Sequence, residues 1–186
     1  MMSENKAEAS SSEIKANGLL TEKGVSIADQ SSIDALSSRG YGTPETKKFI
    51  LSFHEALYLI DKEMLTVNDK KGKEINFQQL LESYKKQNEN AWVNYLVYRD
   101  LRSRGYVVRE GFGEGIAFRI YERGTYGKDT APYMIMSTQE GQPLPIEELT
   151  NALQLCKNQK KELILAVMNR RGETVYYSIG ELRIPP

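Results

Sequence analysis

Near the C-terminal end of the sequence, Leu163-Ile-Leu-Ala-Val-Met168 forms an unbroken apolar run. Such a run is typical of a strand that is covered on both faces of a sheet. Arg170-Arg-Gly172 follows as a hairpin turn, and residues 173–179 alternate as a final strand. Residues 146–158 precede the run as an amphipathic helix, with Pro145 at its start, where a missing N–H is tolerated. The four segments together predict a sheet with a helix packed against it.

The pattern continues upstream with an amphipathic helix over residues 92–103, which Gly105 ends and whose apolar face contains Trp92, Tyr95, Leu96 and Leu101. Three strands follow, over residues 106–109, 116–121 and 133–136. The glycines of residues 111–115 suggest a nucleotide loop, but a phosphate-binding loop should open a helix, and here a strand comes next. We therefore expect a glycine-rich hairpin. The order α-β-β-β-α-β-β predicts a compact α/β domain around a central mixed sheet.

The first half of the chain has a different pattern. Apolar spacing predicts one or two short strands over residues 19–27 and a further strand over residues 64–67. It predicts helices over residues 32–39, 44–60 and 77–86. Residues 85–90 are polar and form a candidate hinge. We therefore predict an α+β protein with a disordered tail at 1–16, a small mixed N-terminal α+β domain at 17–88 and a C-terminal α/β domain at 89–186.

Composition excludes several classes of protein. The chain has 186 residues, 40% of them hydrophobic, and 25 Lys and Arg balance 25 Asp and Glu, so it is no polycation. A single cysteine, Cys156, and a single histidine, His54, cannot form an internal disulfide or a zinc site of the usual four Cys and His ligands. We expect no metal or cofactor. The absence of a long apolar run or a signal peptide predicts a soluble cytoplasmic protein with no membrane partner.

Few side chains point to chemistry by themselves. His54 lies on an apolar helix face and is expected to be a solvent-facing or partly buried structural residue. Cys156 lies near a helix end and is expected to be buried in the packing. Tyr121 ends a strand beside a charged loop, and Lys161 precedes the apolar strand. Between residues 99 and 128, a basic excess could contact RNA phosphates, although ordinary surface salt bridges explain it equally well. Its basic members are Arg99, Arg102, Arg104, Arg109, Arg119, Arg123 and Lys128.

Several of these segments resemble one protein family. Residues 95–179 are similar to the C-terminal domain of archaeal tRNA intron-splicing endonucleases, through Tyr95-Leu-Val-Tyr-Arg-Asp-Leu-Arg-Ser-Arg-Gly-Tyr-Val-Val108, Ala117-Phe-Arg-Ile-Tyr-Glu-Arg-Gly124, Asp129-Thr-Ala-Pro-Tyr-Met-Ile135, Lys160-Lys-Glu-Leu-Ile-Leu-Ala-Val167 and Gly172-Glu-Thr-Val-Tyr-Tyr177. The N-terminal half adds Ser37-Ser-Arg-Gly-Tyr-Gly42, Glu55-Ala-Leu-Tyr-Leu59 and Gly72-Lys-Glu-Ile-Asn-Phe77. The resemblance implies a nuclease-like C-terminal domain.

The resemblance also implies a chemistry. The family cleaves RNA at bulge-helix-bulge junctions without a metal, through attack of a ribose 2′-OH on its own phosphodiester. In the family, a Tyr, a His and a Lys carry out this reaction, and the motifs place the Tyr at Tyr121 and the Lys at Lys161. The His position holds Thr130, whose hydroxyl cannot act as a general acid near neutral pH. Gln154 stands where the family usually has an arginine that grips a bulged base.

These departures favour a non-catalytic structural subunit, which pairs with a homologous catalytic chain in a two-plus-two heterotetramer. Precursor tRNA would be the RNA partner, contacted by Arg119, Arg123, Lys128 and Lys160. An active nuclease that uses Tyr121 and Lys161, or an RNA-binding module without a partner, remains open.

Two further features bear on assembly. The family has an acidic loop between its last two strands, whereas residues 169–173 here hold two bases and one acid. The apolar side of the last strand, Val175, Tyr177 and Ile179, is expected in a dimer contact, with an internal edge strand of a monomer as the alternative.

Overall fold

The computed structural model describes residues 15–46 and 48–182. In the N-terminal half, a sheet has the strand order β3-β4-β2-β1-β5-β6, antiparallel except for the parallel pair β1 and β5. Its strands are β1 (Ala16–Thr21), β2 (Gly24–Ile27), β3 (Thr43–Glu45), β4 (Lys48–Leu51), β5 (Leu65–Asn68) and β6 (Glu74–Ile75). The helices of this half are α1 (Gln30–Ser38), α2 (Phe53–Asp61) and α3 (Phe77–Lys85).

The C-terminal half forms a mixed sheet in the order β11-β10-β9-β8-β7, in which only β9 and β10 run parallel. Its elements are α4 (Ala91–Ser103), β7 (Val107–Glu110), β8 (Phe118–Tyr121), β9 (Tyr133–Gln139), α5 (Ile146–Asn158), β10 (Glu162–Met168) and β11 (Thr174–Ile179). The predicted order α-β-β-β-α-β-β is confirmed, and so is the mixed α+β fold. Residues 111–115 connect two strands, as expected of a hairpin.

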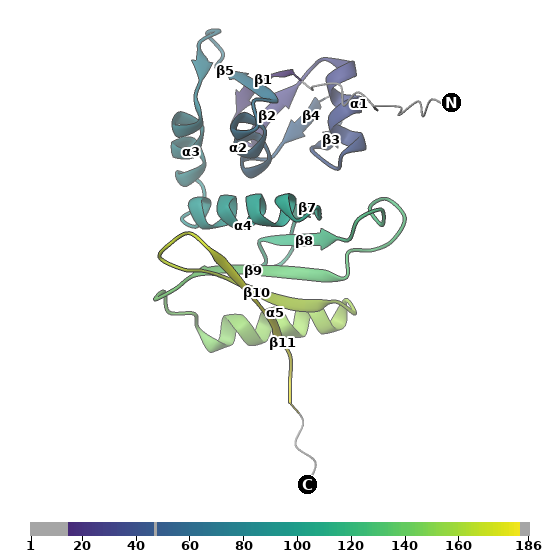
Figure 1. Cartoon of the computed structure of the whole chain (residues 1–186), viewed down its shortest axis with the longest axis vertical. Coiled ribbons are helices and arrows are strands. Elements are labelled where there is room, and N and C mark those ends of the chain that lie inside the picture. Colours follow the sequence, from purple (N-terminus) through teal and green to yellow (C-terminus); the bar gives the residue numbers. More distant parts are fainter. Residues whose placement is uncertain (1–14, 47, 183–186) are drawn as a thin grey trace, which may run out of the picture.

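Helix α4 lies between the two halves (Figure 1). One side of it contacts α2 and α3, and the other contacts β7, β9 and β10. Most of its residues are therefore buried, among them Tyr95 and Tyr98. One continuous apolar core extends from the N-terminal sheet through α2 and α4 to β8.

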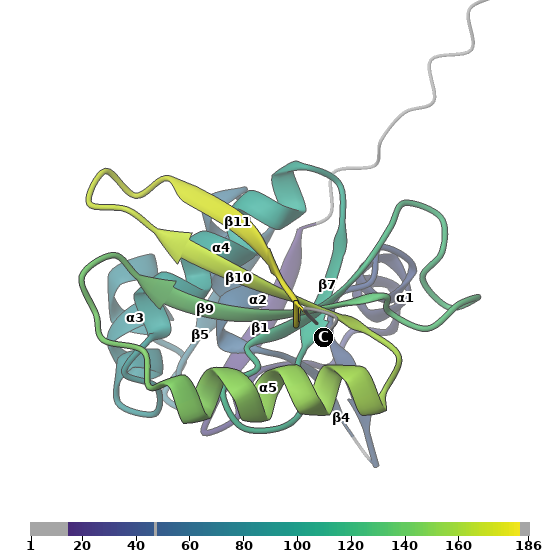
Figure 2. The ribbon, with the colours of Figure 1, turned by 90° about the horizontal axis from the view of Figure 1, so that it is seen from below.

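A second, smaller core lies on the opposite face of the C-terminal sheet. There α5 packs against β10 and buries Ala152 and Cys156 beside Met134 and Met136. Figure 2, the view from below, shows α5 running along this outer layer. Cys156 is fully buried, as the sequence predicts. None of the helices in the described ranges has the length and apolar composition needed to cross a bilayer.

One predicted element is wrong. The helix expected over residues 44–60 is two short strands, β3 and β4, followed by the shorter helix α2. Ser52 caps the N-terminus of α2, and its backbone N–H donates a 2.9 Å hydrogen bond to Glu55 Oε2 in a reciprocal N-terminal cap. Phe49 and Leu51 face the core with the two-residue spacing of a strand.

Two predictions of burial also need correction. Trp92, expected on the apolar face of α4, is 41% exposed, because the preceding residue Ala91 occupies the core instead. β10 was expected to be covered on both faces, but Ile164, Leu165 and Val167 are only half-buried. The reason is its position next to the edge strand β11, where the covering helices reach only part of the sheet.

The expected domain boundary falls between α3 and α4, and it stays a prediction. Of the tail predicted to be disordered, residues 1–14 lie outside the described residues. Ala16 at its end begins β1 and is buried.

Candidate functional site

The strand register brings three of the sequence-predicted positions to the end of the C-terminal sheet where β8 ends and β9 and β10 begin. We call this end of the three strands the edge. Ile120 on β8 and Glu162 on β10 are both partners of Tyr133 on β9. The next residues outward, Tyr121 and Lys161, therefore flank the start of β9, with Thr130 just before it. Since neighbouring strands lie about 4.8 Å apart, the backbones at Tyr121 and Lys161 are separated by roughly 10 Å.

Each side chain at this edge has a definite environment. The Tyr121 ring is 9% exposed and meets the Tyr126 ring edge-on, with centroids 5.1 Å apart. Lys161 Nζ donates a 2.5 Å hydrogen bond to the carbonyl of Ala131. Thr130 is exposed to solvent. The edge thus holds a phenol and an ammonium group, and an aliphatic hydroxyl lies between them along the chain.

The four expected RNA-binding residues divide into two groups. Arg123 and Lys128 are exposed on the loop between β8 and β9, and Lys160 is exposed at the end of α5 with a left-handed φ of 54°. Each of the three lies within two residues of Tyr121, Thr130 or Lys161 along the chain. Arg119 on β8 does not join them, because its side chain lines a cleft between the two halves of the chain.

His54, the histidine of the sequence, does not lie at this edge, and it is fully buried in the core where a solvent-facing or partly buried residue was predicted. It is 3% exposed, and its ring packs against Tyr98 and Phe118 at centroid distances of 4.7 and 5.0 Å. Its Nε2 shares a 2.8 Å hydrogen bond with Ser52 Oγ. Burial, aided by the charge of Arg109, lowers the pKa of His54 from 6.5 to about 3. Among the described residues, no hydrogen bond connects it to Tyr121 or Lys161.

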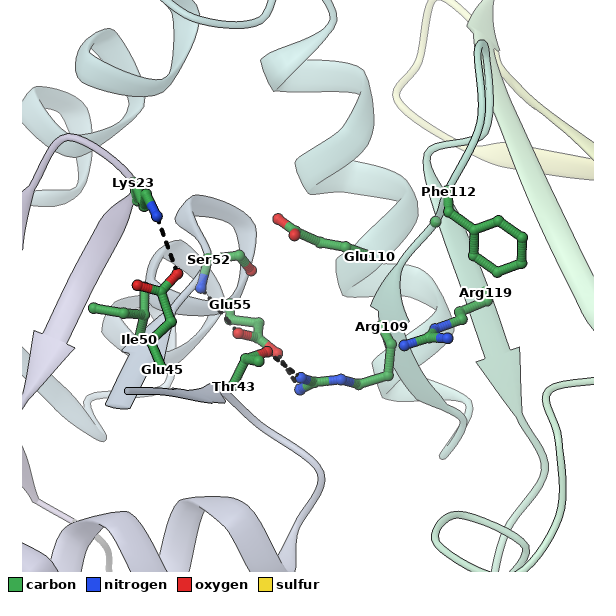
Figure 3. Close-up of a pocket in the computed structure, with 11 residues that line it drawn as sticks. Lys23, Thr43, Glu45, Ile50, Ser52, Glu55, Arg109, Glu110, Phe112 and Arg119 are labelled. Atoms are coloured by element: carbon green, nitrogen blue, oxygen red, sulfur yellow. Dashed lines mark hydrogen bonds and ion pairs between the residues drawn. The ribbon is translucent and has the colours of Figure 1, made fainter. Parts of the chain in front are cut away.

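The cleft between the halves has a volume of about 670 Å³ and takes its lining from β3, β4, α2, β7 and β8. Figure 3 shows the Arg109 side chain extending from β7 toward Glu55 and Thr43. Arg109 Nη1 donates to Glu55 Oε1 at 3.0 Å and to the Gly40 carbonyl at 3.1 Å, while Nη2 donates to Thr43 Oγ1 at 2.5 Å. One guanidinium thus links the two halves.

Glu55 is the buried partner in this link. Its carboxylate also accepts hydrogen bonds from the backbone N–H groups of Gly42 and Ser52, at 3.1 and 2.9 Å. Burial raises the pKa of the Glu55 carboxyl, and the charge of Arg109 with these two N–H donors opposes the rise. Sequence reasoning missed the pair, because its members are 54 positions apart. The capping pattern Ser52-x-x-Glu55 was the one available signal.

The comparisons with known proteins agree with this architecture. Residues 16–81 match the tRNA intron endonuclease N-terminal domain, and residues 91–177 match the tRNA intron endonuclease catalytic C-terminal domain. The chain belongs to the tRNA intron endonuclease family. A tRNA-splicing endonuclease of Methanococcus vannielii is 34% identical over 89% of this chain and 93% of its own length. One of Pyrococcus furiosus is 34% identical over 76% of this chain and 81% of its own length.

Membership of the tRNA intron endonuclease family confirms the predicted resemblance in both halves of the chain. It does not assign roles to Tyr121, Thr130 or Lys161, which stay predictions. Within the described ranges, no group of three or more His, Cys, Asp and Glu side chains is placed to hold a metal ion.

Proposed function

We propose that this chain is the structural, non-catalytic subunit of a heterotetrameric tRNA-splicing endonuclease. It pairs two-plus-two with a homologous catalytic chain, in the cytoplasm, and the complex removes introns from precursor tRNA at bulge-helix-bulge junctions. The observation that carries the proposal is Thr130 at the position that the family resemblance assigns to the catalytic histidine.

The reaction requires a group that the edge of this sheet does not offer. When a ribose 2′-OH attacks its own phosphodiester, the departing 5′ oxygen must receive a proton, and a general acid serves best when its pKa is near the working pH. The hydroxyl of Thr130 has no such pKa. His54 cannot substitute for it, because its ring is enclosed between the halves of the chain and its pKa of about 3 leaves it neutral.

The remaining side chains at the edge suit a structural role. Lys161 is held by the carbonyl of Ala131, and Tyr121 packs against Tyr126. Both contacts stabilise the loop between β8 and β9, which carries the exposed bases Arg123 and Lys128. These bases would position phosphates without reading sequence.

The edge strand β11 supports the pairing in this proposal. It pairs only with β10 in the described part of the chain, and it exposes 46% of Val175 and 51% of Tyr177. An edge strand with apolar side chains is able to bind a second chain through its free backbone groups and its exposed face. Val175, Tyr177 and Ile179 are therefore proposed as the contact with the partner subunit.

The test is a cleavage assay with a bulge-helix-bulge precursor RNA. We expect no cleavage by the purified chain alone and cleavage once a homologous chain with an intact histidine is added. Cleavage by this chain alone, lost in Lys161→Ala and kept in the exposed control Lys70→Ala on the turn between β5 and β6, would refute the proposal and establish an active nuclease.

A co-purification experiment separates the proposal from a simple RNA-binding module. The tagged chain should recover a homologous endonuclease chain from cells of its source, and the mass of the complex should correspond to two copies of each. Recovery of RNA with no homologous chain would instead identify a module that binds RNA by itself.

A further inference from the structure

The cleft between the two halves contains equal numbers of acidic and basic side chains, but two of them have no ion-pair partner among the described residues. Its charged lining residues are Lys23, Arg109, Arg119, Glu45, Glu55 and Glu110. Lys23 pairs with Glu45 at 3.3 Å, and Arg109 pairs with Glu55 at 3.0 Å. Within the described ranges, neither Arg119 nor Glu110 forms an ion pair. The cleft therefore offers one free donor and one free acceptor.

Arg119 lies beside another positive charge, and among the described residues no carboxylate pairs with it. Arg109 is its register partner across the β7–β8 ladder, and two like charges directly opposite each other are unfavourable. Arg109 is neutralised by Glu55, whereas Arg119 Nε is buried without a hydrogen-bond partner among the described residues. A buried donor left unpaired is costly, so an unpaired group in a cleft is reason to look for a ligand.

A flat apolar surface accompanies the free arginine. The Phe112 ring is 38% exposed, and the Arg119 guanidinium lies over it at 5.9 Å from the centroid. Figure 3 shows Arg119 directed toward Arg109, Phe112 beside it, and the Glu110 carboxylate directed toward Ser52. An aromatic ring and an arginine plane are the surfaces on which unpaired RNA bases stack.

The donor and acceptor pattern selects one base. Arginine binds the O6 and N7 acceptors of guanine with two hydrogen bonds, and a carboxylate only accepts, which suits the N1–H and N2–H₂ donors of the same base. Adenine offers one amino group, and pyrimidines lack N7. We propose that the cleft binds an unpaired guanine of RNA, stacked on Phe112 and hydrogen-bonded by Arg119 and Glu110. The inference rests on the proposed function for its choice of RNA over other ligands.

The position of the cleft also favours RNA. Arg119 and Tyr121 are two residues apart on β8, so their side chains leave the same face of the strand about 7 Å apart. An RNA strand that passes the edge at Tyr121 therefore comes close to Arg119. The volume of about 670 Å³ has room for a nucleotide and its water.

The experiment titrates guanosine 5′-monophosphate into the full chain and follows the Nε–Hε resonance of Arg119 by NMR. We expect a saturable shift at millimolar nucleotide, with weaker binding of the adenosine, cytidine and uridine monophosphates. Phe112→Ala should weaken binding roughly fivefold or more. Trp92→Ala, which removes another exposed aromatic ring that is not part of the cleft lining, is the matched control and should leave binding unchanged.

A second variant isolates the base contact. Glu110→Gln should reduce the preference for guanosine over adenosine monophosphate, and thermal unfolding should show that this exposed substitution leaves the fold intact. A circular dichroism spectrum makes the same check for Phe112→Ala.

Three outcomes would overturn the inference. Absence of a saturable shift excludes a nucleotide site. An equal shift with ribose 5-phosphate shows that the cleft recognises phosphate and not the base. A shift produced by a peptide of residues 167–175 but not by guanosine monophosphate shows that a protein segment occupies the cleft. Because the probe is a mononucleotide and no cleavage or partner is measured, failure here leaves the structural-subunit proposal standing.

Discussion

Acidification should destabilise this protein through one residue, His54. Burial holds the pKa of His54 at about 3 in the folded chain, against 6.5 for an exposed imidazole. Between these two values the unfolded chain binds a proton that the native chain does not. The free energy of unfolding therefore falls as the pH is lowered through this range.

The size of the effect follows from the shift. At about pH 5 the unfolded imidazole is mostly protonated and the native one is neutral. Linkage then lowers the free energy of unfolding by about 2 kcal/mol relative to about pH 7. Glu55 acts in the opposite direction, since burial raises its carboxyl pKa and the native state binds that proton more tightly. Its contribution is largest at low pH and is lost as the pH rises.

Urea unfolding at the two pH values measures the change, and the variant His54→Phe isolates it. Phenylalanine keeps the ring contacts with Tyr98 and Phe118 and loses the hydrogen bond to Ser52. At about pH 7 the variant should be about 1 kcal/mol less stable than the wild type, because it lacks that hydrogen bond, and at about pH 5 it should be about 1 kcal/mol more stable. The variant should also lack the fall in the free energy of unfolding that His54 causes between about pH 7 and about pH 5. Glu55 is present in both proteins, so its contribution cancels in the comparison.

NMR provides an independent check, because the sequence has one histidine and its imidazole signals need no assignment. The His54 resonances should stay unchanged between about pH 8 and pH 5. A titration midpoint near 6.5, or identical pH slopes in the wild type and His54→Phe, would refute the reasoning from burial. Such a result would also restore His54 as a source of protons near neutral pH.

Two further predictions concern the contacts between the halves and the backbone beside them. Arg109→Met leaves Glu55 buried without its cation and should lower the free energy of unfolding by about 3 kcal/mol at neutral pH. The loss should become smaller as the pH is lowered, because burial raises the pKa of the Glu55 carboxyl and protonation removes its uncompensated charge; a loss that does not change with pH would contradict this. The exposed control Arg171→Met should cost less than about 0.5 kcal/mol in the same urea titration. Gly42 has a φ of 68°, and a Cβ there would lie 2.3 Å from Phe49 Cε1, so Gly42→Ala should cost about 3 kcal/mol by thermal unfolding. Gly127→Ala, with a φ of 81° and nothing within 4 Å of the added Cβ, should cost about 1 kcal/mol; equal losses would mean that the clash with Phe49 is unimportant.

The fold of the second half follows from local patterns in the sequence. The helices there have a helical apolar period, residues 163–168 form a continuous apolar run, and glycine or proline marks the ends of several elements. The sequence pattern predicts one helix over residues 44–60 because Phe49 and Phe53 happen to fall at helical spacing. Short strands give too few residues to establish a two-residue period, so the N-terminal cap at Ser52 was the more informative signal.

The candidate site was predictable only in part. The resemblance in the sequence predicts Tyr121, Thr130 and Lys161 as site positions, and the strand register brings these positions to one edge. The cleft was not predictable, because Glu55 and Arg109 come from different halves and meet only after both have folded. Phe112 lies in a glycine-rich hairpin, where sequence alone gives no reason to expect a stacking surface.

The burial of α4 on both sides bears on how this gene could be divided. Residues 85–90 look like a natural cut in the sequence, yet the helix that follows supplies part of the core under α2 and α3. A fragment that ends at residue 88 would expose the apolar surface of α2 and α3 to solvent, and the complementary fragment would expose the apolar face of α4. Expressed separately, the two fragments should be poorly soluble. Expressed together, they should associate without a covalent connection.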